Sequence, residues 1–103
     1  MNVCILSGRL VRNAVGNQEK ALAFTLATRY GFDPNDGKER VAFVPCVMFN
    51  PPKELVELLT NKGKGLLVEL EGRVSNSSYE ADGERKYKTD VIVKNGTFSL
   101  MKG

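Results

Sequence analysis

Aromatic and basic residues lie close together at several places in this sequence. Phe43 and Phe49 would stand about 20 Å apart on a single strand, at a rise of about 3.3 Å per residue. Aromatic rings stack on nucleobases, and lysine and arginine neutralise phosphates, so together they bind single-stranded nucleic acid with little sequence preference. The candidate residues for such a surface are Tyr30, Phe32, Phe43, Phe49, Tyr79, Tyr87, Arg29, Lys38, Arg40, Lys62, Lys64, Arg73, Arg85, Lys86 and Lys88.

The segment 40–49 is apolar on both faces of the strand that it predicts. Its odd-numbered residues from Phe43 to Phe49 point to one side, and its even-numbered residues from Ala42 to Met48 point to the other. Such a strand is usually buried on both faces, yet Pro45 cannot donate to a central ladder. Because the even-numbered face can supply the core, we interpret the phenylalanine face as an outer surface for bases, with a subunit interface as the alternative. Phe24 and Phe98 are assigned structural roles.

The composition argues against an enzyme. The sequence has no histidine, which removes the commonest general base and metal ligand. Cys4 and Cys46 lack CxxC spacing and are interpreted as buried free thiols in a reducing cytoplasm. Asp33, Asp36 and Glu39 are interpreted as a solvated turn, with a weak calcium loop as the alternative. We therefore expect no catalytic residues, no cofactor and no metal site.

Length and charge indicate one small domain over residues 1–103. The net charge of +3 is mildly basic and permits an anionic partner. No segment has the pattern of a signal peptide or a membrane span, so we expect a cytoplasmic protein without membrane contact.

The hydrophobic pattern predicts strands over 3–11, 21–29, 40–49, 66–74 and 87–94. Asn50 is a candidate N-cap for a short helix that ends at 61–63. The segments 13–20 and 30–39 are predicted as loops, 75–86 as a polar loop or hairpin arm around Asp82-Gly83, and 95–103 as the closing segment. This order predicts an all-β OB-fold, a five-stranded Greek-key barrel with one helix between strands three and four.

Four segments in order at matching spacing resemble the OB-fold domain of the bacterial single-stranded DNA-binding protein family. They are NVCILSGRL (2–10), AFTLAT (23–28), KGLLVELEGRV (64–74) and the stretch from Asp82-Gly83 through YKTDV (87–91). The resemblance implies coating of single-stranded DNA in replication, recombination or repair. It also implies a homo-oligomer, a tetramer before a dimer. By position, Phe43, Phe49 and Tyr79 match stacking positions of the family, and Tyr30 or Phe32 lies near another.

The sequence also departs from the family pattern. It has no tryptophan, and Phe43-Val44-Pro45-Cys46 replaces the usual start of strand three. The family's linker and acidic tail, which recruits other replication proteins, do not follow Lys102-Gly103, as in a trimmed domain or a tailless variant of phage or plasmid origin. The alternative function is a primosomal-type OB-fold dimer that mainly bridges replication proteins.

Overall fold

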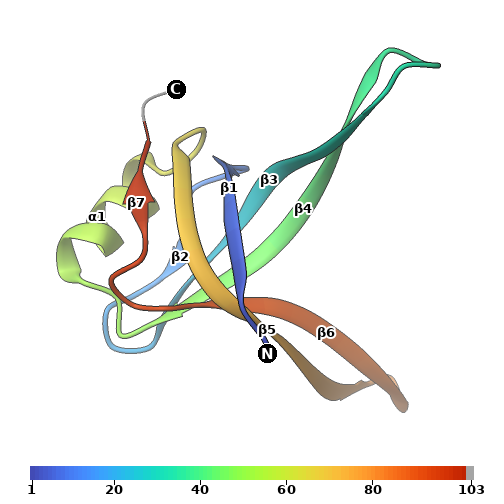
Figure 1. The fold of residues 1–103 in the computed structure, drawn as a ribbon. Helices are drawn as coiled ribbons and strands as arrows, with labels where there is room; N and C mark the ends of the chain where they lie inside the picture. Colours follow the sequence, from blue (N-terminus) through green and yellow to red (C-terminus); the bar gives the residue numbers. More distant parts are fainter. Residues whose placement is uncertain (102–103) are drawn as a thin grey trace.

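Five long strands close into a barrel in this computed structural model, which describes residues 1–101 (Figure 1). The elements are β1 (Cys4–Leu10), β2 (Val15–Gly16), β3 (Ala21–Asp33), β4 (Lys38–Phe49), α1 (Lys53–Lys62), β5 (Leu67–Ala81), β6 (Glu84–Val93) and β7 (Ser99–Leu100). The strands pair in the order β1-β3-β4-β6-β5, and β5 pairs again with β1. This closure, with α1 between β4 and β5, confirms the predicted OB-fold. Of the predicted closing segment, residues 102 and 103 lie outside the described residues.

The core is built from the alternate residues that the strands turn inward. Phe24 is 5% exposed, and its ring meets that of Phe98 edge-on at 5.9 Å between centroids. Helix α1 contributes Leu59, which is fully buried. The other buried apolar residues are Leu10, Ala14, Leu22, Leu26, Cys46, Met48, Val68, Leu70, Val91 and Val93. The structural roles predicted for Phe24 and Phe98 are therefore confirmed.

Two hairpins extend far beyond the barrel as arms, β3–β4 and β5–β6, and they point in different directions (Figure 1). The predicted loop over 30–39 is wrong, because most of it is paired strand and only residues 34–37 form the turn. Turn-forming residues are dense there, but a few of them suffice to reverse the chain. The hairpin alternative for 75–86 is correct. Asp82 and Gly83 form its turn with φ of 54° and 79°.

The predicted helix cap is also wrong. Helix α1 begins at Lys53, and the N-cap position is taken by Pro52, which has no side-chain capping bond. Asn50 instead adopts a φ of 53°, a left-handed conformation that asparagine tolerates better than most residues. Asn50 therefore serves the turn between β4 and the helix.

Pro45 lies inside β4 without breaking a ladder bond. It is opposite Thr25 of β3, whose carbonyl accepts the Val11 N–H at 2.9 Å on the other edge of that strand. The Thr25–Pro45 pair is thus a non-hydrogen-bonded pair, and the Pro45 nitrogen points away from β3. On that edge, the pairing of β4 with β6 begins only at Cys46. The missing N–H therefore falls at a position where neither neighbouring strand requires a donor.

Candidate nucleic-acid interface

The outward side of the β3–β4 hairpin, here called the outer face, carries Phe43 and Phe49. Their side chains are 67% and 49% exposed. Phe43 is opposite Ala27, and Phe49 is opposite Ala21. These small partners cover little of the rings, so a flat ligand can approach them. The alternation predicted from the sequence is confirmed, since Cys46 and Met48 of the same strand are buried.

A bulge places Phe32 on the same outer face. Arg29 is opposite Val41, but Phe32 is opposite Glu39, because the register shifts by one residue between Arg29 and Gly31. Paired residues share a face of a sheet, and an extra residue reverses the alternation beyond it. Strict alternation would have turned Phe32 inward. The glycine at position 31, inside a strand pattern, was the signal that could have revealed this bulge.

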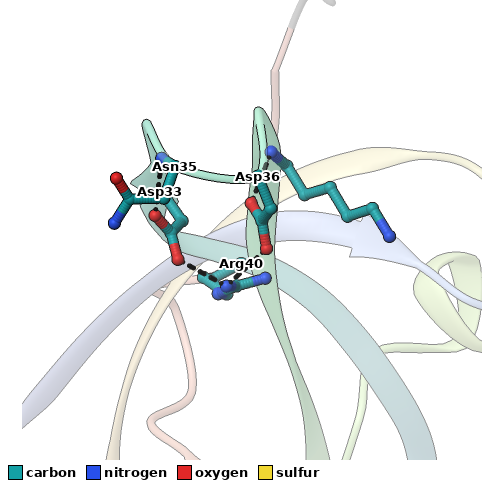
Figure 2. Close-up of polar contacts among 5 residues, drawn as sticks. Asp33, Asn35, Asp36 and Arg40 are labelled. Atoms are coloured by element: carbon teal, nitrogen blue, oxygen red, sulfur yellow. Dashed lines mark hydrogen bonds and ion pairs between the residues drawn. The ribbon is translucent and has the colours of Figure 1, made fainter.

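The tip of the β3–β4 arm is a small polar network (Figure 2). One guanidinium nitrogen of Arg40, Nη2, lies 2.9 Å from Asp33 Oδ2 and 2.8 Å from Asp36 Oδ2. The other carboxylate oxygens accept backbone N–H groups, Asp33 from Asn35 and Asp36 from Lys38, each at 2.9 Å. Both aspartates are therefore engaged by protein groups. In residues 1–101, no cluster of three or more histidine, cysteine or acidic side chains could hold a metal ion.

The second arm, β5–β6, carries two of the candidate tyrosines on different faces. Tyr79 is opposite Lys86, whereas Tyr87 is opposite Ser78, so the two rings lie on opposite faces. Val47 of β4 is aligned with Ile92 of β6, which puts Ile92 on the outer face. Counting back by twos along β6 puts Lys88 and Lys86 on that side, and Tyr79 with them. Tyr87 lies on the other side with Arg85.

The predicted basic residues do not form one group. Three of them are held by carboxylates: Arg40 at the tip, Arg29 at 3.3 Å from Glu39, and Lys88 at 3.9 Å from Asp90. Within the described part of the chain, six form no ion pair, namely Lys38, Lys62, Lys64, Arg73, Arg85 and Lys86. Lys62 is the last residue of α1, and Lys64 follows the helix just before Gly65, whose N–H donates to the Leu10 carbonyl. Neither lysine lies on an arm.

Arg73 and Phe49 both line an open hollow of about 530 Å³ between the chain start and β6, together with Ile92 and Lys94. Arg73 is opposite Ile92 in the β5–β6 ladder and therefore faces the outer side. Lys94 is 3.4 Å from Glu71, so Arg73 is the cation lining this hollow that has no carboxylate partner in residues 1–101.

Comparison with known proteins identifies the family of this chain. The model of the single-strand binding protein family matches residues 1–99. The chain belongs to this family. It is 35% identical over 104 residues to a single-stranded DNA-binding protein of Clostridium perfringens, covering 95% of this chain and 65% of that protein. It is 36% identical to one from Lactiplantibacillus plantarum, covering 99% and 52%.

Solved structures of single-strand binding proteins share the fold. A Plasmodium falciparum SSB in complex with ssDNA has a TM-score of 0.74 at 19% identity, over 98% of this chain and 93% of that one. A Thermus aquaticus single-stranded DNA binding protein has a TM-score of 0.70 at 23% identity, over 100% and 51%. The predicted resemblance is thereby confirmed. This single-strand binding family chain spans less than two thirds of the length of the bacterial relatives named above.

The two thiols of this single-strand binding family chain differ in environment. Cys46 is buried, and its thiol donates to the Val44 carbonyl at 3.6 Å, whereas Cys4 is only half-buried. Burial, together with the smaller effects of Cys4 and Asp90, raises the pKa of the Cys46 thiol from 9.0 to about 12. The prediction of buried thiols is correct for Cys46 and wrong for Cys4, which lies where β1 begins.

In the described residues, none of the helical segments has the length and apolar character needed to cross a membrane.

Proposed function

We propose that residues 1–103 form one OB-fold domain that binds single-stranded DNA without sequence preference and catalyses no reaction. The observation that carries the proposal is the exposure of Phe43 and Phe49 on the outer face of a strand whose other face fills the core. Phe32 and Tyr79 extend the same face along the two arms. The names of the bacterial relatives and of the solved structures support this function.

The free energy of DNA binding would have two contributions, base stacking and phosphate neutralisation. Each base stacked on an exposed ring contributes about 1–3 kcal/mol, whatever its identity. Lys86 and Arg73, which lie on the outer face and have no carboxylate partner in residues 1–101, would neutralise phosphates between the stacked bases. In a duplex the faces of the bases are already stacked on one another, so the outer face would find no free base. Strong discrimination against duplex DNA follows.

The experiment is a fluorescence-anisotropy titration of labelled oligo-dT and of a duplex of the same length. We expect tight binding to oligo-dT and much weaker binding to the duplex. The logarithm of the association constant should fall with the logarithm of salt concentration, with a slope of about 0.7 per neutralised phosphate. Equal affinity for the two ligands would show that the exposed rings do not stack on bases, and the proposal would fail.

We also propose a homo-oligomer, a tetramer before a dimer. Strand β1 bonds β3 only through Arg9 and Leu10, so its segment from Cys4 to Gly8 has one unpaired edge. Ile5 on this strand is 68% exposed, and Val3, two residues before it, is also exposed. A second copy that added its own β1 would satisfy the edge and cover these side chains. Light scattering that gives the 11.4 kDa monomer at micromolar concentration would exclude this assembly.

The wider role would be protection of single strands during replication, recombination or repair, in the cytoplasm of a bacterium or encoded there by a phage or plasmid. A stable dimer in light scattering would instead favour the primosomal-type alternative, in which the domain mainly bridges replication proteins. The two functions also differ in the DNA titration, because a bridging factor needs no tight binding to oligo-dT.

A further inference from the structure

One cation, Arg40, pairs with two aspartates at the tip of the β3–β4 arm. Arg40 reaches from β4 to both Asp33 and Asp36 with the same nitrogen, and all three side chains are between 32% and 40% exposed. Each aspartate also accepts a backbone N–H within the turn (Figure 2). A further bond joins the Gly37 N–H to the Asp33 carbonyl at 2.9 Å. Arg40 thus links both ends of the turn.

This arrangement is unsuited to phosphate binding. A guanidinium that already bridges two carboxylates carries no surplus positive charge at its position. If it turned to a phosphate, two carboxylates would be left unpaired beside a polyanion, which is electrostatically unfavourable. The cation at the tip that has no carboxylate partner in residues 1–101 is Lys38.

The polar network at the tip of the arm is next in sequence to Phe32, an exposed aromatic residue on the outer face. Asp33 directly follows Phe32, and Phe32 follows the bulge that turns it to the outer side. Phe32 is 62% exposed, so packing does little to fix its place. The two ion pairs hold the strand ends on either side of the turn, and with them the backbone that carries Phe32.

We propose that Arg40 is a positioning residue for single-stranded DNA binding. It keeps the arm tip in the conformation that presents Phe32 on the outer face, and it makes no contact with phosphate. This inference rests on the proposed function, and it differs from the direct DNA-binding role that the sequence led us to expect for Arg40.

The first test asks whether a double variant binds DNA more tightly or more weakly than the unmodified protein. Asp33→Asn combined with Asp36→Asn keeps both oxygen acceptors for the turn amides but removes the two charges that hold Arg40. Simple electrostatics predicts tighter DNA binding, because the protein becomes more positive. A positioning role predicts weaker binding to oligo-dT, by about 5-fold or more if the stack of one base is lost. Tighter binding by this double variant would overturn the inference.

The second test separates positioning from phosphate contact. Arg40→Gln should weaken oligo-dT binding to a similar extent while leaving the salt slope unchanged. A lost phosphate contact would instead reduce the slope by about 0.7 and would overturn the inference. Lys86→Gln is the control for a phosphate contact, because Lys86 lies on the outer face opposite Tyr79, and it should reduce the slope.

A double-mutant cycle then connects Arg40 to the ring. In a Phe32→Ala background, Arg40→Gln should cause no further loss of affinity, because the group that it positions is gone. Fully additive losses, or no loss from Phe32→Ala alone, would overturn the inference. Thermal melts should be little changed in all variants, since the arm lies outside the core. Failure of the unmodified protein to bind oligo-dT would contradict the proposed function itself, whereas the other outcomes concern Arg40 alone.

Discussion

Phe43 lies directly opposite Ala27 in the β3–β4 ladder, so a single methyl group stands beside one of the most exposed rings in the described structure. The same relationship recurs between Phe49 and Ala21. A cross-strand neighbour normally packs against an aromatic ring and shields it. Here the neighbour leaves room beside the ring, which is the space that a stacked base requires.

Removing either ring should therefore affect DNA binding far more than folding. Phe43→Ala and Phe49→Ala should each weaken oligo-dT binding by about 1–3 kcal/mol. Phe24→Ala is the control, because that ring is 5% exposed and a buried phenylalanine costs about 3–5 kcal/mol of folding free energy. Oligo-dT titrations and thermal melts on the three variants check this. If Phe43→Ala or Phe49→Ala unfolds the protein or splits an oligomer while DNA binding persists, the outer face is an interface and not a stacking surface.

The two tyrosines of the β5–β6 arm provide a matched pair. Tyr79 shares the outer face with Lys86, and Tyr87 points to the opposite side. Tyr79→Ala should weaken oligo-dT binding by about 1–3 kcal/mol, and Tyr87→Ala should have a clearly smaller effect. Both side chains are at least half exposed, so neither change should lower the melting temperature much. Equal losses from the two variants would mean that DNA contacts both faces of the arm.

Gly8 should be intolerant of any side chain. A Cβ at this position would lie 2.4 Å from the Ala27 carbonyl oxygen, because β1 crosses closely over β3 there. Gly8→Ala should destabilise the fold by about 1–3 kcal/mol, as overpacking does in other cores. Gly31→Ala is the control, since its Cβ would meet nothing within 4 Å. Urea unfolding of both variants measures the difference, and equal stability would contradict the close approach.

Cys46 should be protected from thiol reagents in the native state. Burial raises the pKa of its thiol from 9.0 to about 12, so the reactive thiolate is scarce near neutral pH. Maleimide labelling followed by mass spectrometry should modify the half-buried Cys4 first, and Cys46 only after denaturation. Equal labelling rates at the two cysteines in the native protein would contradict this burial.

The same pKa predicts a dependence of stability on alkaline pH. The folded protein holds the Cys46 proton more tightly than the unfolded chain, so this group favours the folded state fully below pH 9.0. Its contribution is lost as the pH rises from 9.0 towards 12. Urea unfolding should therefore show a steeper loss of stability over this range for the natural protein than for Cys46→Ala. Parallel curves would exclude the contribution.

The sequence by itself determined the barrel and the direction of most strand side chains. Alternation placed Phe24 inside and Phe43 and Phe49 outside, and the switch to helical spacing after Asn50 located α1. These features depend on local patterns, because the period of two in a strand and the period near 3.6 in a helix are properties of the backbone. A closed barrel has one interior, so an apolar strand with a filled inner face leaves its other face outside.

Only the tertiary structure decided which predicted site residues act together. The bulge before Gly31 brought Phe32 to the outer face, the β5–β6 register divided Tyr79 from Tyr87, and two aspartates engaged Arg40. Each outcome depends on strand register, which long-range hydrogen bonds set, and a shift of one residue reverses the face of every side chain beyond it. The sequence of one strand alone therefore does not determine its register with the strand that pairs with it.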